Sequence, residues 1–280
     1  MNKLLALNNL LSAFGLFMLV QACSPSSSSA TLSSSDFPYN LDKPEVFPLP
    51  LSLLEISGIA FNKGNAKITY AIQDEKGAIY QLNKDEITQK TQFIKNGDYE
   101  DLSILNNQIY VLQSSGKVFT TALSEMVNKE TTATSEIDIK LPKGEYESLY
   151  ADPETQSLFI LCKKCDKKNS ILGFQYDLKR QKKKPETFEI KTKNFSKKGF
   201  AASALARNPI DKDWYVISAI NASLLVFDTD WNFKESIELK KDNFRQPEGI
   251  AFDQAGHLYI SSEGDDFTKG KILKFSRITD

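Results

Sequence analysis

A short apolar segment preceded by polar or acidic residues recurs five times along this chain of 280 residues. The copies are Glu55–Phe61, Asp98–Ile104, Glu145–Ala151, Phe200–Ala206 and Gln246–Phe252. Measured at the third position of each copy, the separations are 43, 47, 55 and 46 residues. A period of this length is typical of β-propellers, in which a four-stranded blade is repeated around an axis.

Every copy continues in the same way. A turn rich in Asn, Asp, Gly or Pro leads to a second strand of β-branched and aromatic residues, and another turn leads to a third strand. In four copies a more polar strand with alternating character follows, such as Ile87–Ile94. No long segment of helical periodicity follows the N-terminal region. The sequence therefore predicts an all-β propeller of five four-stranded blades, and a six-bladed ring would need one more copy.

The fifth copy is not followed by a fourth strand before Asp280. An extended segment, residues 45–51, precedes the first copy and could supply the missing strand; the alternative is a disordered leader. Three prolines in or beside it, Pro44, Pro48 and Pro50, suit an outer strand, where no ladder donor is needed. We expect this segment to complete the last blade and to close the ring, which protects the strand edges.

The first 22 residues have the pattern of an export signal. Lys3 is the one charged residue, a largely apolar stretch follows, and small residues precede a cysteine. The segment Val20–Cys23 resembles a bacterial lipobox, in which the cysteine thiol receives a diacylglyceryl group. A plain membrane-spanning anchor is the alternative, but the apolar stretch is short for one.

The serine-rich segment after Cys23 is typical of a solvated tether. We therefore divide the chain into a signal peptide (1–22), a lipidated Cys23 with its linker (23–36) and a propeller domain (37–280). The expected location is the cell envelope, facing away from the cytoplasm and on the outer membrane in preference to the plasma membrane, with the lipid on Cys23 as the contact with the bilayer.

Charge excludes one class of partner. Removing the signal peptide takes away one positive charge, so the formal net charge moves from −1 to −2, and a near-neutral domain has no general attraction for nucleic acid. Residues 163–198 hold 13 Lys or Arg against 4 Asp or Glu. That run could meet anionic lipid or polysaccharide, but lysines on an outer strand are also the usual protection against edge pairing. We expect a monomer.

Acidic residues stand where the chain enters the first strand of each copy and where it leaves the second. In a propeller these two places share one face around the axis, here named the acidic mouth. Converging carboxylates repel unless a cation is present, and several oxygen ligands suit Ca²⁺. The candidate metal ligands are Asp74, Glu100, Glu147, Glu248 and Glu263. In the alternative interpretation these carboxylates only cap strands and hydrate a loop face.

Three segments carry a family resemblance: Glu55–Phe61, the central Glu147–Pro153, and the closing Pro247–Asp253 with Gly256–Glu263. Together they resemble the SdiA-regulated (YjiK-like) family over about residues 44–275. The closing segment alone is shared by many propellers, including NHL-repeat proteins and gluconolactonases. The resemblance implies an envelope propeller that binds calcium, and it implies no known reaction.

Other chemistry finds little support. A Ser-His-Asp triad would have to use His257, the single histidine, which stands in a turn that usually serves structure. Cys162 and Cys165 cannot fill a four-ligand zinc site, and a redox motif would need a different fold context. In an exported protein we expect them to form a disulfide.

Two functional hypotheses follow. The first is a non-catalytic binding or scaffold module that presents the acidic mouth to a small molecule, glycan or protein in the presence of Ca²⁺. The alternative is a Ca²⁺-dependent hydrolase resembling gluconolactonase or propeller phytase.

Overall fold

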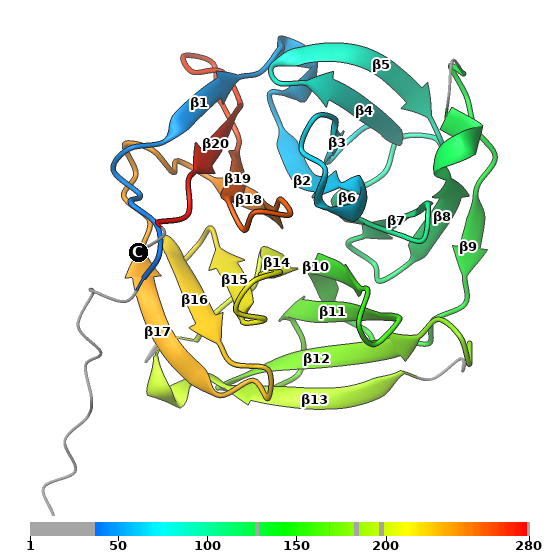
Figure 1. The fold of residues 1–280 in the computed structure, drawn as a ribbon. Helices are drawn as coiled ribbons and strands as arrows, with labels where there is room; N and C mark the ends of the chain where they lie inside the picture. The colour runs from blue at the N-terminus through cyan, green and yellow to red at the C-terminus, as the bar shows by residue number, and fades with distance from the viewer. Residues whose placement is uncertain (1–36, 127–128, 168, 182–184, 196–198, 279–280) are drawn as a thin grey trace, which may run out of the picture.

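The structure is a computed structural model that describes residues 37–126, 129–167, 169–181, 185–195 and 199–278. Within these ranges the strands form five four-stranded antiparallel sheets that surround one axis (Figure 1). The prediction of an all-β propeller with five blades is confirmed. The predicted signal peptide, Cys23 and the serine linker lie outside the described residues.

The blades follow one another along the chain. Blade one comprises β2 (Ile56–Phe61), β3 (Thr69–Gln73), β4 (Ala78–Asn83) and β5 (Glu86–Gln92), and blade two comprises β6 (Tyr99–Leu105), β7 (Gln108–Gln113), β8 (Val118–Ala122) and β9 (Ser135–Ile137). Blade three comprises β10 (Glu145–Asp152), β11 (Ser157–Lys164), β12 (Ser170–Asp177) and β13 (Glu186–Lys191), and blade four comprises β14 (Ala204–Arg207), β15 (Trp214–Ser218), β16 (Ser223–Phe227) and β17 (Phe233–Glu238). Blade five comprises β18 (Pro247–Phe252), β19 (Leu258–Ser262), β20 (Lys271–Phe275) and β1 (Glu45–Pro48). In the described ranges, four short 3₁₀ helices lie in connections between strands: η1 (Leu51–Leu53), η2 (Asn62–Gly64), η3 (Leu123–Met126) and η4 (Thr192–Asn194).

Burial changes from the axis to the rim. All residues of the inner strand β2 are buried, whereas exposure alternates with partial burial along the outer strands β5 and β17. An inner strand is covered by its neighbours on both sides, so most of its residues are buried and apolar. An outer strand has one face in water, which explains the polar alternation seen in the sequence.

Tight turns fix the register within the blades. Strands β6 and β7 are joined by Asn106 and Asn107, whose φ angles are 52° and 60°. Two consecutive residues of positive φ form the turn whose twist matches antiparallel strands, and asparagine tolerates this conformation better than most residues.

The ring is closed by the N-terminal strand. Strand β1 pairs antiparallel with β20, from Glu45 opposite Lys274 to Pro48 opposite Lys271. Figure 1 shows this pairing of the two ends of the chain at the rim of the ring. The closure predicted from the sequence is confirmed, and it places the first described residues beside the last blade.

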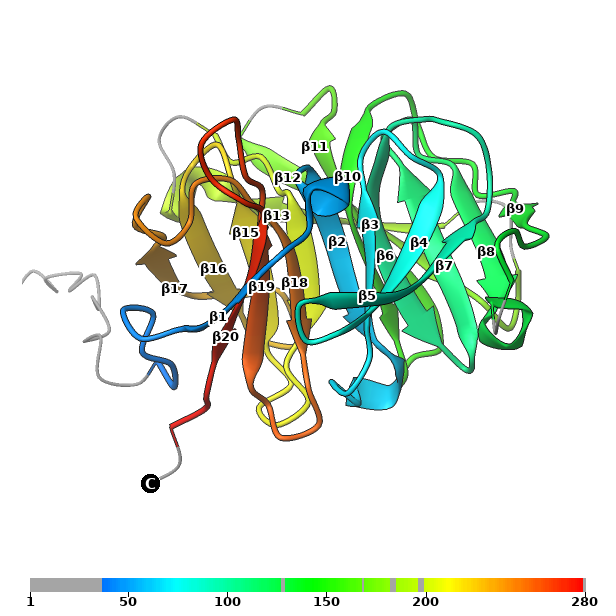
Figure 2. The same cartoon turned by 90° about the horizontal axis from the view of Figure 1, so that it is seen from above.

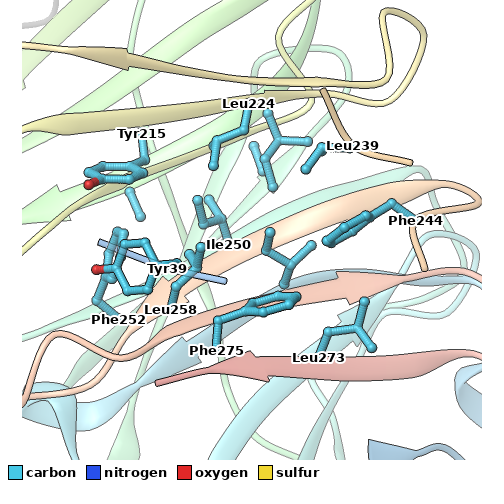
Figure 3. Packing of buried hydrophobic residues seen from close by; sticks show 14 of the residues in the cluster. Tyr39, Tyr215, Leu224, Leu239, Phe244, Ile250, Phe252, Leu258, Leu273 and Phe275 are labelled. Atoms are coloured by element: carbon cyan, nitrogen blue, oxygen red, sulfur yellow. The ribbon is translucent and has the colours of Figure 1, made fainter. Parts of the chain in front are cut away.

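Five apolar clusters fill the five spaces between neighbouring blades. Figure 3 shows the one between blades four and five, where the rings of Tyr215 and Phe252 meet at 4.9 Å between centroids. Tyr39, which precedes β1, packs its ring against both of them, at 6.3 Å from each centroid. The N-terminal segment therefore contributes to the core as well as to the sheet.

Hydrogen bonds join the inner strands of adjacent blades near the axis. The buried carboxylate of Asp101 accepts one bond from its neighbour Leu102 N and a second from Leu149 N of blade three, each 2.8 Å long. Its position is possible because Gly58 lies opposite, where any Cβ would collide with the Asp101 carboxylate. Ser261 Oγ of blade five donates to Ser57 O of blade one at 2.7 Å.

In the described part of the chain no helix has the length and apolar character that a membrane crossing requires.

We predict that the closing segment is essential to stability while the linker is not. A chain starting at Leu51 loses β1, the buried Tyr39 and the buried Leu49. Loss of two such core side chains alone costs about 4–8 kcal/mol, so the melting temperature should fall on the order of 10 °C or more. A chain starting at Phe37 should melt like one starting at Ser24. Equal melting of all three chains would contradict this account of closure.

Candidate functional site

The predicted acidic residues lie at one end of the axis. They stand where the chain enters the inner strands and in the connections that leave the second strands, on the side of the ring where Figure 2 shows the loop between β19 and β20. All five candidate side chains are buried or half-buried. The structure therefore brings the predicted residues to one mouth, although they come from four blades.

Irregular strand pairing places three of the glutamates. Glu100, Glu147 and Glu248 are each the residue passed over by a register shift, where two residues of the inner strand face one residue of the next. Such β-bulges turn the side chain of the extra residue away from the normal alternation. The repeated motif thus encodes one geometric device in blades two, three and five.

Blade four departs from this pattern. The buried Ala202, just before its inner strand β14, stands where the other blades have Ser57 or glutamate, and the exposed Ile220 occupies the connection leaving its second strand. The acidic mouth is consequently asymmetric, with its negative charge gathered over blades one, two, three and five.

A lysine that we did not predict lies among these carboxylates. Lys163 Nζ forms an ion pair with Glu147 Oε1, and the two side chains are only 18% and 10% exposed. Ser148 pairs with Leu161, and Lys163 lies two residues after Leu161. In the same way Gly249 pairs with Ser261, and Glu263 lies two residues after Ser261. It therefore holds in blade three the place that an acidic residue holds in blade five. The basic run 163–198 therefore does not lie wholly on the outer edge of the blade, because its first residue belongs to the mouth.

A disulfide flanks this lysine. Cys162 and Cys165 are joined across a Cα separation of 6.0 Å, and the bond encloses Lys163 and Lys164. The bridge packs against Gly144, where a Cβ would lie only 2.7 Å from Cys165 Sγ. A short covalent loop of this kind limits the positions that the Lys163 backbone can adopt.

Burial and mutual repulsion raise the pKa of the acidic groups. Burial, followed by the charges of Glu147 and Asp98, raises the pKa of Glu100 to about 9. Burial and the Glu248 carboxylate raise the pKa of Glu263 to about 8.

Glu248 and Asp74 show the same tendency. Burial and the neighbouring Glu147 raise the pKa of Glu248 to about 7, against the lowering effect of Lys163. Burial and the Glu55 carboxylate raise the pKa of Asp74. These groups are close enough to disfavour one another's charged forms, and one lysine does not compensate them all.

Two carboxylate oxygens of the mouth lack any hydrogen-bond donor. Asp74 Oδ1 and Glu147 Oε2 are both buried and unpartnered, a situation that is costly for an ionised oxygen. Within the described ranges, however, no three acidic, histidine or cysteine side chains stand in an arrangement that could hold a metal ion. The mouth has the ligand types of a Ca²⁺ site without a preformed coordination shell.

The histidine lies elsewhere. His257 occupies the turn between β18 and β19, at the end of the axis opposite the acidic mouth (Figure 2). Its Nδ1 accepts a bond from Arg277 N at 3.0 Å, and its own backbone N–H donates to Asp253 Oδ1 at 2.9 Å. This ring therefore fixes the C-terminal segment against a turn.

We predict that repulsion in the mouth makes the protein less stable as the pH rises. A carboxyl whose pKa is higher in the folded than in the unfolded state contributes stability that is present at low pH and lost as the pH rises through the folded value. For Glu100 this loss of stability extends from about pH 4.5, the ordinary pKa, to about pH 9, the pKa in the folded protein. Glu100→Gln should therefore raise the melting temperature at pH 9 and not at pH 5.

Glu86→Gln, a change on the exposed outer strand β5, is the control and should not give this pH-dependent gain. A gain from Glu100→Gln that is the same at pH 5 and pH 9 would contradict the repulsion argument. Both can be read from thermal unfolding in chelator-treated buffer.

Comparison with known proteins agrees with the fold. The structure is similar to a chain of a nidogen–laminin complex (TM-score 0.51, 12% identity, 74% of this chain and 72% of that one). It is also similar to a protein of unknown function from Bacteroides thetaiotaomicron (TM-score 0.50, 14% identity, 80% and 59%). At these identities the likeness concerns the fold alone, and no curated protein matches the sequence. The family model described as SdiA-regulated matches residues 31–269, and the chain therefore belongs to the SdiA-regulated family.

Proposed function

We propose that this protein is a lipoprotein of the cell envelope, anchored through Cys23, whose propeller is a non-catalytic binding module. Its acidic mouth is the ligand-binding face, and Ca²⁺ is part of the bound state. The ligand itself is a small molecule, glycan or protein that reaches the mouth from solution.

The observation that carries this proposal is the crowding of buried and half-buried carboxyl groups in the mouth. Glu100, Glu248 and Glu263 have pKa values raised to about 9, 7 and 8. Around neutral pH these carboxyl groups are therefore partly protonated, and their raised pKa values lower the free energy of unfolding. A divalent cation binds the ionised forms, so it would replace those protons and remove the repulsion. Hard carboxylate oxygens are the ligands that Ca²⁺ prefers.

Loading would require movement of side chains. Lys163 already neutralises one oxygen of Glu147, while the other oxygen, Oε2, has no partner. A cation near Glu147 would be repelled by the lysine ammonium, so uptake would be accompanied by rotation of Lys163 away from the axis. Metal and lysine thus compete for the same carboxylate.

Calcium titration tests the proposal. Ca²⁺ added to the chelator-treated mature protein at pH 7.5 should release heat and protons and raise the melting temperature. Lys163→Met should bind Ca²⁺ more tightly because the competing charge is gone, and Glu147→Gln should bind it more weakly. Lys164→Met removes the same charge from the exposed neighbouring lysine, whose partner is Glu145, and should have a much smaller effect.

Absence of heat, proton release and thermal shift at millimolar Ca²⁺ would overturn calcium as part of the site. Turnover of lactone, aryl ester or phosphate monoester substrates that disappears with Glu147→Gln would overturn the non-catalytic part and favour a hydrolase.

We also predict that Cys23 decides the location of the protein. Cys23→Ala should abolish lipid attachment, because the thiol is the acceptor, and should shift the protein from the membrane fraction to the soluble fraction. Incorporation of labelled palmitate followed by fractionation measures this. Cys162→Ala, which removes a cysteine of the propeller, should leave labelling intact. Labelling that persists in Cys23→Ala would contradict the anchor.

A further inference from the structure

A cavity opens at the end of the axis opposite the acidic mouth. Its volume is about 350 Å³, and it is lined by the last residues of the inner strand of every blade and by the turns that follow. Figure 2 shows that η2 and the turn between β18 and β19 lie on the side of the ring away from the β19–β20 loop. This axial cavity is therefore separate from the acidic mouth.

The walls of the axial cavity are mainly apolar. Apolar lining residues come from all five blades: Ile59, Leu102, Leu149, Leu205, Ile250 and Phe252. Water in such a space finds few of the two to four polar partners that hold it in place. An apolar molecule that displaces this water gains transfer free energy in proportion to the surface that it buries. The volume lies at the lower end of the range of small-molecule sites.

The lining offers a ligand the buried acceptor Asn62 Oδ1, which has no donor among the described residues, and the hydroxyl donor of Tyr150. Tyr150 contributes to the cavity wall, and its ring packs edge-on against Trp214 at 5.6 Å. Within the described ranges its hydroxyl has no hydrogen-bond partner in the protein. Burial and the carboxylate of Asp152 raise the pKa of this phenol, so it stays protonated and can donate.

The arginine of the lining is already neutralised. Arg207 Nη1 lies 3.3 Å from Asp152 Oδ1 and 2.9 Å from Glu154 Oε2. The guanidinium also lies 5.2 Å from the ring centre of Trp214. With two carboxylates beside it, Arg207 offers no net charge to an anionic ligand. The other two charged residues of the lining, Lys63 and Asp253, are of opposite sign, so the lining has no excess of positive charge, which indicates that the occupant is neutral.

We propose that the axial cavity binds a small neutral molecule with an apolar body and one acceptor oxygen, which receives a hydrogen bond from the Tyr150 hydroxyl. This site is independent of the acidic mouth and of Ca²⁺. It would give the propeller two binding sites of opposite character at the two ends of one axis.

Two probes of equal heavy-atom count separate the contribution of the Tyr150 hydrogen bond from that of apolar burial. Acetophenone has the acceptor oxygen, and isopropylbenzene has a methyl group in its place. Both should bind the mature wild-type protein, with affinities measured by ligand-observed NMR. Tyr150→Phe should weaken acetophenone about two- to tenfold, the value of one neutral hydrogen bond, and should leave isopropylbenzene unchanged.

The position of the site needs its own test. Intermolecular NOEs in the wild-type protein should connect the probe ring to methyl groups of Leu102, Leu149 and Ile250. Ala60→Leu, which fills part of the lining, should weaken both probes, whereas Val46→Ala on the exposed outer strand should change neither.

Three results would overturn the proposal. The first is no binding of either probe at millimolar concentration. The second is an equal effect of Tyr150→Phe on both probes, or no effect on either. The third is tighter binding of benzoate than of acetophenone, which would show an anion site.

Discussion

Packing between neighbouring blades is the constraint on which the whole structure depends. A single blade of this chain has an apolar inner strand and two apolar faces, and it can cover them only by contact with blades on both sides. The five clusters between blades are therefore completed only when blade five meets blade one. The pairing of β1 with β20 provides the last outer strand, and Leu49 and Leu53 join the cluster between those two blades. A segment that looks like a leader in the sequence is thus a structural necessity.

The same repetition that builds the ring concentrates charge on its axis. A β-bulge at one position of the motif directs a side chain toward the mouth in each of three blades. Glutamates at that position therefore gather at the mouth although they are far apart in the sequence. Blade four has Ala202 there and blade one has Ser57, which prevents a full ring of negative charge. Burial, with repulsion as the second cause, still raises several pKa values, and this is tolerable in a fold held together by apolar clusters farther from the axis.

The sequence was sufficient for the fold because blade repeats, turn residues and the β1 segment are local patterns with one geometric solution. It also placed Glu100, Glu147 and Glu248 on one face, since equivalent positions of a repeat must share a face. It did not reveal the Lys163–Glu147 pair, because Lys163 belongs to a basic run whose other members suit an exposed edge. Alignment of the connections after the second strands would have found it beside Glu263. The axial cavity was missed for a different reason: its walls are ordinary strand residues, and empty space between them depends on side-chain packing across five blades.

If the chain is anchored through Cys23 as we propose, the contacts of Tyr39 have a mechanical consequence. Its hydroxyl donates to Gly256 O at 2.7 Å and accepts from Asn208 Nδ2 at 2.9 Å, while Pro38 O accepts from Ile278 N at 2.9 Å. A pull on the chain from the N-terminal side reaches Tyr39 before it reaches β1. The ring of Tyr39 must leave its place against Tyr215 and Phe252 before any force can peel β1 from β20. A pulling force on the domain therefore acts first on the contacts of Tyr39 with blades four and five. The pairing of β1 with β20 is protected until those contacts break.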